Sequence, residues 1–261
     1  DRRDGFEEYV LYGGLPPVVL TNNTEDKTNL LNSLFTETYI RDIINRHRIR
    51  NVSELESLLD IISSNIGTLT NPEKLKNTFR TVKKSKITST TITKYLEYLT
   101  DAYLIEASKR YDVKGKAYIE TPLKYYYSDL GLRNARLNFR QVEMPHSMEN
   151  IIYNELRMRG YNVDIGSVTT IEKNSAGSAI RKHLEIDFVC NKGSKRYYIQ
   201  SAYALPDEKK REQELRPLRK IDDSFKKIII TSDTPGIFYN DDGIMMMNIF
   251  DFLLDQESMD K

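Results

Sequence analysis

Residues 53–128 constrain the fold most, because their apolar spacing changes from a helical to a strand-like period within one stretch. From Leu55 to Ile66, leucine and isoleucine recur every three or four residues, as on one face of a helix. Pro72 predicts the first position of a second helix, and Thr88-Ser89 the start of a third. Two strands are expected around Lys114-Gly115, over residues 103–113 and 116–128. Three short helices followed by a β-hairpin are the layout of a winged helix-turn-helix.

The first 50 residues are expected to be helical. Two glycines and two prolines between Gly13 and Pro17 end a first helix. A longer helix is predicted from Glu25 to Arg46. Its stripe comprises Leu31, Leu34, Phe35, Thr38, Tyr39 and Asp42.

Residues 141–261 alternate between helical and strand-like patterns. Strict alternation over 183–190 predicts a strand with one face formed by Leu184, Ile186, Phe188 and Cys190. The remaining pattern predicts a helix over 149–159, strands over 161–171 and 195–205, a helix to residue 220, strands over 226–231 and 244–248, and a final helix over 249–255. We therefore expect an α+β protein in three parts, over residues 1–50, 51–140 and 141–261.

The composition is that of a packed globular protein. The chain has 261 residues, of which 39% are hydrophobic and 30% charged, a composition that does not indicate extended disorder. Cys190 is its single cysteine, which excludes an intramolecular disulfide and a cysteine-based zinc cluster and predicts a reducing, cytoplasmic location. No apolar run approaches the ~20 residues of a membrane span, so no membrane partner is expected. The chain begins with Asp1 rather than Met, and we expect it to be part of a longer one.

The net charge of +1 conceals an uneven distribution. Residues 73–140 hold 15 Lys and Arg against 7 Asp and Glu, whereas residues 201–261 hold 9 against 13. A local basic surface attracts phosphate even in a neutral chain, although a solvated basic face explains the same pattern. The candidates for nucleic-acid contact are Lys83, Lys84, Lys86, Lys94, Lys109, Arg110, Lys114 and Lys116. The interleaved tyrosines, at positions 111, 118 and 125–127, are expected to pack in the core rather than to stack on bases.

The sequence lacks the motifs of nucleotide hydrolysis and of a local histidine metal site. Gly115-Lys116 is its single Gly-Lys pair, and no glycine precedes it at the spacing of a phosphate-binding loop. The three histidines, His47, His146 and His183, lie far apart in the sequence. This chain alone is therefore not expected to be an ATPase.

One hydrolytic constellation is partly present. Enzymes that cleave phosphodiesters with Mg²⁺ can combine a helix carboxylate, an acid on a strand and an acid-x-Lys on the next strand. Glu149, or alternatively Glu155, supplies the helix carboxylate, and Asp187 is the strand acid and candidate metal ligand. An ordinary solvent-facing strand residue is the alternative role of Asp187.

The third part of this constellation is altered. Gln200 stands in the acid position, where its carbonyl is a neutral ligand, and Ala202 stands where the lysine is needed. Lys209 or Lys210, in the next predicted helix, is an alternative source of that charge.

Several longer segments together resemble one protein family. They are Phe6–Val18, Tyr39–Ile43, Tyr95–Leu99, Lys124–Asn134 and Leu184–Val189. Over essentially its whole length, the chain resembles the C-terminal part of bacterial and archaeal AAA-type ATPases that carry a C-terminal domain of unknown function. The resemblance implies an ATPase module with ATP and Mg²⁺ before Asp1, of which residues 1–50 are the tail. It further implies a winged helix and a restriction-endonuclease-like α/β domain, whose acid-x-Lys motif is replaced here by Gln200 and Ala202.

We therefore expect this chain to bind duplex DNA or a protein partner through the winged helix, without catalysis of its own. Its own ATPase module is an expected partner, and oligomer formation stays open. One alternative is an active Mg²⁺-dependent DNA nuclease that uses Glu149, Asp187 and Gln200 with a relocated lysine. The other is a protein-interaction or sensor module, in which the winged helix packs on the ATPase module and touches no DNA.

Overall fold

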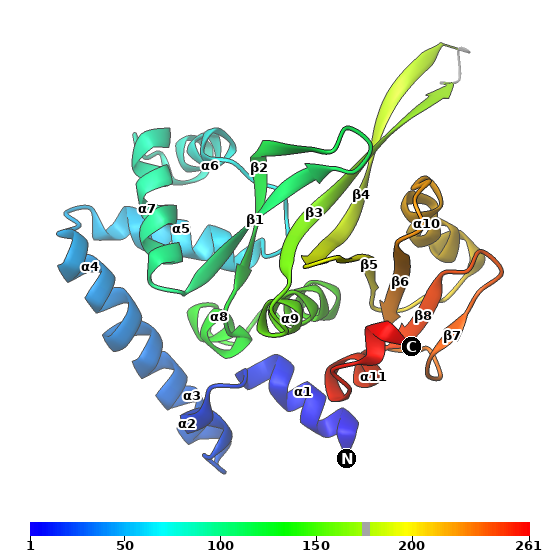
Figure 1. Ribbon diagram of the computed structural model, residues 1–261. Coiled ribbons are helices and arrows are strands. Elements are labelled where there is room, and N and C mark those ends of the chain that lie inside the picture. Colours follow the sequence, from blue (N-terminus) through cyan, green and yellow to red (C-terminus); the bar gives the residue numbers. More distant parts are fainter. Residues whose placement is uncertain (174–177) are drawn as a thin grey trace. The chain divides into compact units, whose positions relative to one another are not determined.

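The computed structural model describes residues 1–173 and 178–261, with the side chains of Lys83 and Lys173 outside the described part (Figure 1). Contacts between Cα atoms divide the chain into two compact units. The helical unit comprises Asp1–Ala107 and Pro122–Ile151, and the sheet unit comprises Ser108–Thr121 and Ile152–Lys261. The division into three parts at residues 50 and 140 stays a prediction.

Helices form most of the helical unit. They are α1 (Arg2–Tyr12), α2 (Pro16–Val19), α3 (Thr24–Ser33), α4 (Arg41–His47), α5 (Val52–Ser64), α6 (Pro72–Thr78), α7 (Ser89–Asp101), α8 (Leu130–Arg136) and the first half of α9 (Met144–Met158). Two π-helical segments, Leu34–Ile40 and Phe79–Lys83, follow α3 and α6 directly.

The long helix predicted over residues 25–46 forms as α3, a π-helical segment and α4. Its predicted stripe is wrong at Thr38 and Asp42, which are exposed. Ile40 and Ile43 are buried instead. A π-helix bonds residue i to i+5, so its wider turn rotates the residues that follow around the helix axis.

The middle of the chain has the predicted elements. Helices α5, α6 and α7 precede the hairpin of β1 (Ile105–Asp112) and β2 (Ala117–Tyr127). The Asn71 side chain caps α6 by accepting from the backbone N–H of Lys74 at 2.7 Å. Thr88 caps α7 in the same way, accepting from the N–H of Thr91 at 3.1 Å. The predicted order of three helices and a hairpin is confirmed.

Helix α8 contacts α1, α3 and α5 and is buried along almost its whole length. Its N-cap residue, Asp129, accepts from the backbone N–H of Gly14 at 2.8 Å. Burial raises the pKa of this carboxyl. The Asn134 amide donates to the carbonyls of Val10 and Leu11, each at 2.9 Å. These bonds attach α1 to α8.

The sheet unit is built on a mixed sheet. In the residues that the structure describes, eight strands have the order β2-β1-β3-β4-β5-β6-β8-β7. Its further elements are the second half of α9, β3 (Asn162–Lys173), β4 (Ala179–Lys192), β5 (Lys195–Ala202), α10 (Glu208–Arg219), β6 (Lys226–Thr231), β7 (Phe238–Tyr239), β8 (Met245–Asn248) and α11 (Ile249–Leu254). Strands β3, β4 and β5 are antiparallel, and β5, β6 and β8 are parallel. The predicted order of helix, three strands, helix and strand is confirmed, and the chain is a mixed α/β protein. None of the helices in the described residues is both long enough and apolar enough to cross a membrane.

A bulge in β4 determines which side chains face α10. Asp164 pairs with Val189 and Gly166 with Ile186, so β3 advances two residues where β4 advances three. Ile186 and Val189 therefore lie in one apolar core, which also contains Leu215 of α10.

The predicted face of β4 is consequently wrong beyond Ile186. Phe188 points to the opposite side of the sheet from Ile186 and packs against Tyr153 of α9, with 6.2 Å between the ring centroids. Strict alternation in the sequence does not show the extra residue, because a bulge is a property of two paired strands.

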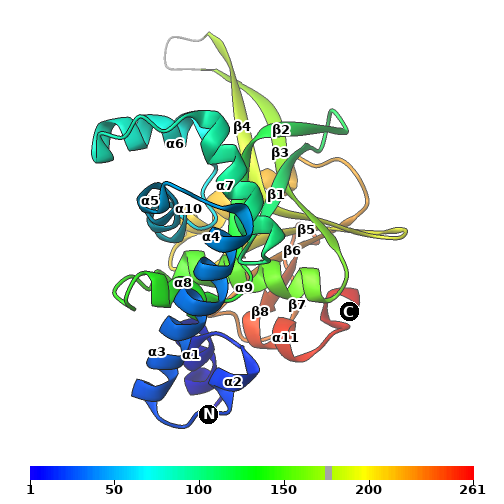
Figure 2. The ribbon, with the colours of Figure 1, turned by 90° about the vertical axis from the view of Figure 1, so that its left-hand side faces the viewer.

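Beyond Ser167 and Glu185, strands β3 and β4 continue as a two-stranded ribbon that extends past the other strands of the sheet unit (Figures 1 and 2). This β3–β4 ribbon comprises residues 168–173 and 179–184, with Val168 opposite Leu184 and Lys173 opposite Ala179. In the described residues, β1 pairs with β3 only as far as Ser167, and β5 pairs with β4 only from Phe188 onward.

Replacing Gly131 with alanine is expected to destabilise the helical unit. A Cβ atom at Gly131 would lie 2.1 Å from the carbonyl oxygen of Tyr12 in α1, so the α1 backbone would have to move. Overpacking of this kind costs about 1–3 kcal/mol or more. The Gly131→Ala melting temperature, measured by circular dichroism, should fall below that of the parent.

Gly5→Ala is the matched control, because it adds the same methyl group to exposed α1, where nothing lies within 4 Å. Alanine favours the helix over glycine, so this variant should melt at or slightly above the parent temperature. Equal melting temperatures for the two variants would contradict the packing of α1 on α8.

Candidate functional site

Glu149, the predicted helix carboxylate, lies on α9 in the helical unit and forms a buried ion pair there. Its Oε1 is 2.9 Å from Lys124 Nζ and accepts from the Tyr126 hydroxyl at 2.7 Å. Lys124 and Tyr126 are two residues apart on β2 and therefore share one face of the strand. The alternative, Glu155, lies in the sheet unit and pairs with Arg159 Nε at 2.6 Å. Both candidate helix carboxylates thus have a cationic partner within their own unit.

The structure brings Asp187 and Gln200 together in the sheet unit, as predicted. Asp187 lies in the bulge of β4, where its Oδ2 accepts from the backbone N–H of Ser201 at 2.8 Å. Its own N–H faces Gln200 Oε1 at 3.4 Å. Asp187 is 7% and Gln200 8% exposed, so the solvent-facing role of Asp187 is wrong.

A third buried acid, Glu214 on α10, extends this pair and is not predicted by motif spacing. Its Oε2 accepts from Gln200 Nε2 at 2.9 Å, and its Oε1 pairs with Lys210 Nζ one turn earlier in α10. We call Asp187, Gln200, Glu214 and Lys210 the Asp187 cluster. The signal for Glu214 is its place directly before buried Leu215, on the apolar stripe of a highly charged helix.

The donor set of the Asp187 cluster does not fit Mg²⁺. This ion requires near-octahedral oxygen ligands with strong negative charge. The Gln200 carbonyl faces the Asp187 N–H, and both Glu214 oxygens accept from Gln200 or Lys210. Within residues 1–173 and 178–261, no three His, Cys, Asp or Glu side chains gather as a metal-binding group. The cluster is better suited to joining β4, β5 and α10 than to holding a metal ion.

The two candidate sources of the missing lysine differ in their surroundings. Lys210 is part of the Asp187 cluster through Glu214, whereas Lys209 is exposed. Ala202, at the position of the expected lysine, is 2% exposed and lies in the core that packs on α10. A long cationic side chain would not fit there without displacing apolar neighbours.

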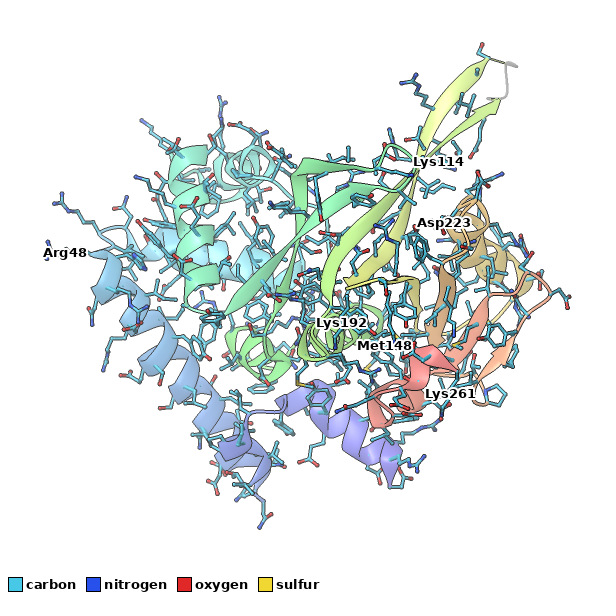
Figure 3. The ribbon with its side chains drawn as sticks, in the orientation of Figure 1. Arg48, Lys114, Met148, Lys192, Asp223 and Lys261 are labelled. Atoms are coloured by element: carbon cyan, nitrogen blue, oxygen red, sulfur yellow. The ribbon has the colours of Figure 1, made fainter. Side chains whose placement is uncertain are left out.

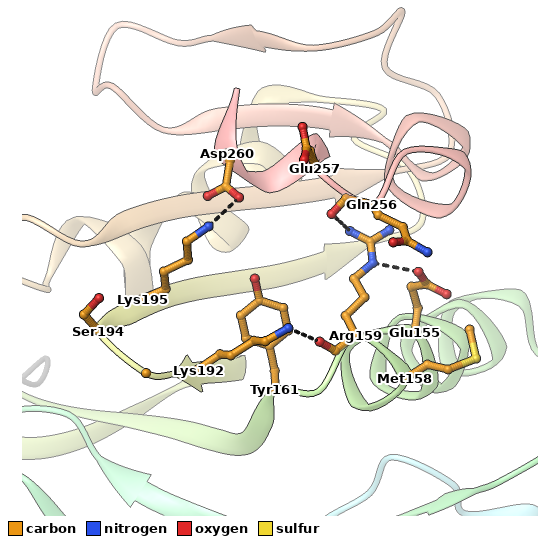
Figure 4. Close-up of a pocket in the computed structure, with 11 residues that line it drawn as sticks. Glu155, Met158, Arg159, Tyr161, Lys192, Ser194, Lys195, Gln256, Glu257 and Asp260 are labelled. Carbon is orange, nitrogen blue, oxygen red and sulfur yellow. Dashed lines mark hydrogen bonds and ion pairs between the residues drawn. The ribbon is translucent and has the colours of Figure 1, made fainter.

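A cavity of about 700 Å³ in the sheet unit contains several charged side chains (Figure 4). Lys195 pairs with Asp260 at 2.7 Å, and Arg159 pairs with Glu155 at 2.6 Å. Lys192 donates to the carbonyl of Arg159 at 2.7 Å. The cations of this cavity are therefore bound to protein acceptors, and no excess charge selects an anionic ligand.

The predicted nucleic-acid-binding residues are divided between the two units. Lys84, Lys86 and Lys94 belong to the helical unit, Lys109, Arg110, Lys114 and Lys116 belong to the sheet unit, and the Lys83 side chain lies outside the described part. On α7, Lys94 is exposed together with Glu97 and Asp101. The exposed face of this third helix therefore carries more acid than base.

The β1–β2 hairpin presents three lysines to solvent, Lys109 on β1 and Lys114 and Lys116 at the turn. Asp112 Oδ1 accepts from the backbone N–H groups of Lys114 and Gly115, at 3.1 and 3.0 Å, which fixes the turn. Lys109, Lys114 and Lys116, here called the turn lysines, are exposed. Their side chains form no ion pair or hydrogen bond within the part of the chain that the structure describes. They are available to an external anion.

The hairpin tyrosines divide between core and surface. Tyr125, Tyr126 and Tyr127 are buried, as predicted, and burial raises the pKa of Tyr125 to about 12. Tyr111 and Tyr118 meet edge to face, with 5.4 Å between their ring centroids, and Tyr118 is 59% exposed. The core prediction is therefore wrong for Tyr118, which lies near the turn, where the strands are solvated.

Comparison with known proteins gives a family and two longer relatives. A family model described as "Domain of unknown function (DUF8612)" matches residues 3–143. An "Uncharacterized protein" of Haemophilus influenzae is 33% identical over 252 residues, covering 95% of this chain and 58% of the relative. "Uncharacterized protein MJ1544" of Methanocaldococcus jannaschii is 28% identical over 246 residues, covering 94% of this chain and 52% of the relative. The chain thus spans little more than half the length of these curated relatives.

A solved structure was also found. The crystal structure of protein VC1899 from Vibrio cholerae matches 89% of this chain and 55% of its own, at 12% identity and a TM-score of 0.29.

Removing the Glu214 carboxylate is expected to destabilise the sheet unit. Glu214→Ala leaves the buried Gln200 amide without its acceptor, and an unsatisfied buried donor costs about 1–3 kcal/mol. Glu212→Ala, on the same helix, removes an exposed acid paired with Arg219 and should cost less than about 0.5 kcal/mol. Urea unfolding followed by circular dichroism measures both, and equal midpoints would show that the Asp187 cluster does not stabilise the fold.

Proposed function

The chain belongs to the family described as Domain of unknown function (DUF8612), and we propose that it is the nucleic-acid-binding part of a longer, ATP-dependent protein. The observation that carries this proposal is the set of turn lysines, which are exposed and unpaired in the described residues. Lysines of this kind neutralise phosphates and release condensed counterions, which supplies most of the affinity of non-specific binding. Asp112, the acid nearest in sequence to the turn, is engaged by backbone N–H groups.

The proposed contact is the hairpin of a winged helix rather than its third helix. The order of α5, α6, α7, β1 and β2 supports this assignment. On α7, Tyr98 is stacked by His47 of α4, with 3.6 Å between the ring centroids and 9° between the planes. The exposed positions of α7 include Lys94, Glu97 and Asp101, so this helix carries more negative than positive charge toward solvent.

The longer protein and its use of ATP belong to the same proposal. The curated relatives extend well beyond the matched region, which leaves room for a further module. The motifs that resemble AAA-type ATPases support the assignment of ATP and Mg²⁺ binding to such a module. Within this chain, the Asp187 cluster is then the scaffold of a nuclease-like domain, with Gln200 and Ala202 in place of the acid-x-Lys motif.

No DNA cleavage is expected from the purified chain in Mg²⁺ or Mn²⁺. The acceptor atoms of Gln200 and Glu214 are occupied by protein donors, and loss of one electrostatic or acid–base group typically costs ~10²–10⁴ in rate. The assay uses linear, branched and single-stranded DNA, with Asp187→Asn as a matched control that keeps the shape of the side chain. Cleavage by the parent that is lost in Asp187→Asn would contradict the scaffold role and make Lys210 the first candidate for the missing charge.

Binding of duplex DNA is expected to weaken steeply with salt. Each phosphate contact contributes a log–log slope of roughly −0.9. Changing Lys109, Lys114 and Lys116 together to glutamate should therefore flatten the slope measured by fluorescence anisotropy. The matched control changes Lys84, Lys86 and Lys94 to glutamate, which alters the charge equally in the helical unit.

The two triple variants separate the candidate surfaces. A flatter slope in the turn variant alone supports the hairpin as the contact. An equal loss in both variants would mean that only net charge matters. If the parent does not bind at low salt, the DNA proposal fails and the protein-interaction module becomes the better one.

A further inference from the structure

The β3–β4 ribbon has the dimensions of an element that enters a DNA groove. Six residue pairs, from Val168 with Leu184 to Lys173 with Ala179, extend it roughly 17 Å at about 3.4 Å per residue. The major groove of B-DNA is wide enough to admit a two-stranded β-ribbon. An isolated two-stranded ribbon is only marginally stable in water. The extra length of β3 and β4 therefore adds little to the stability of the sheet unit.

The two faces of the ribbon differ in their contacts. On one face, Glu172 pairs with Arg216 of α10 and lies 4.0 Å from Lys182. Glu172 and Val168 are an even number of residues apart on β3 and therefore point to the same side of the ribbon. Val168 belongs to the apolar core that packs on α10. This face is therefore directed toward α10, and its charges are largely paired.

The other face, here called the open face, consists of Thr169, Ile171, Arg181 and His183. Thr169 lies opposite His183, and Ile171 opposite Arg181, so the four side chains share one side. Ile171 is 72% exposed, and Arg181 is exposed with no ion pair or hydrogen bond in the described residues. The four positions contain no acid; Glu185 is the first acid toward the base of the ribbon.

The open face combines a cation with an apolar side chain at one cross-strand pair. An arginine can bind guanine O6 and N7 in the major groove, and an apolar side chain can contact the thymine methyl group. Surfaces that bind a protein partner are usually larger and more apolar than the open face, on which Ile171 is the one aliphatic side chain among the four. Charge and shape together favour duplex DNA.

The turn that carries Lys114 and Lys116 lies next to the base of this ribbon, and Lys109 lies three residues before Asp112 on β1. Asp112 pairs with Ser167, and the N–H of Val113 donates to the Ser167 carbonyl at 3.0 Å. The ribbon begins at the next residue of β3, and Figure 3 labels Lys114 beside it. Phosphate contacts position a protein on a duplex, whereas groove contacts discriminate between bases.

We propose that the β3–β4 ribbon enters the major groove of duplex DNA with its open face toward the bases, while the turn lysines bind the flanking phosphates. This inference rests on the proposed function and assigns it a groove and a pair of reading residues, Ile171 and Arg181. It applies to B-form DNA, because the major groove of A-form RNA is too deep and narrow for side chains to read.

The test compares two neighbouring cations on opposite faces. Arg181→Thr and Lys182→Thr each remove one positive charge, and threonine suits a β-strand. The parent and both variants are titrated with a DNA duplex and an RNA duplex of the same sequence by fluorescence anisotropy, and circular dichroism melting confirms that all are folded. Arg181→Thr should weaken DNA binding roughly five- to a hundredfold, the value of a lost bidentate base contact. Lys182→Thr should weaken it much less, and RNA binding should respond equally weakly to both.

Each other outcome overturns part of the proposal. If the turn variant weakens DNA binding while Arg181→Thr behaves as Lys182→Thr, the ribbon inference is wrong and the proposed function stands. If Arg181→Thr weakens DNA and RNA binding equally, the ribbon contacts phosphates and the groove assignment is wrong. If Arg181→Thr changes only the sedimentation of the chain, the open face is a contact between copies. If the parent binds neither duplex, the proposed function fails together with the inference.

Discussion

The register of strand β4 is the constraint on which the sheet unit depends. Its extra residue between Ile186 and Val189 lets both of these side chains enter the core on α10. The same bulge interrupts the pairing at Asp187, whose carboxylate accepts the Ser201 N–H while its own N–H faces Gln200. The candidate site thus lies where the strand is irregular, and the ribbon begins on the other side of Ile186, where the pairing is regular again.

The Asp187 cluster shows how a buried polar site can be structural without being open to a ligand. Both polar atoms of the Gln200 side chain have a partner. Its Oε1 faces the backbone N–H of Asp187 in β4, and its Nε2 donates to Glu214 in α10. A buried amide or carboxylate costs free energy unless it is paired, so each member requires the others. A catalytic metal site must instead leave acceptor atoms available for the ion. The bonding within this cluster therefore accounts for its buried charges through stability alone.

Sequence spacing predicted the helices and strands that local residues determine. It did not predict features that depend on the packing of a second segment. Capping residues determine the helix starts at Asn71 and Thr88. An apolar run determines the strand Lys226–Thr231. The bulge in β4 depends on its pairing with β3, and the bond of Glu214 to Gln200 depends on the packing of α10 on the sheet, so motif spacing predicts neither. The basic residues also look like one set in the sequence, but the hairpin is long enough to pass from one unit into the other. Its turn lysines therefore belong to a different unit from Lys94.

The charges of the sheet unit fall into two classes with different energetics. Glu214 of the Asp187 cluster and the Arg159–Glu155 pair of the cavity are largely buried and paired, because an unpaired buried charge is strongly destabilising. The turn lysines and Arg181 are solvated, so leaving them unpaired costs almost nothing. Exposed cations attract a polyanion over about a Debye length, ~8 Å at physiological salt, without selecting a sequence. Selection requires short-range contacts with bases, and the ribbon adjoining the turn is the element that we propose for them.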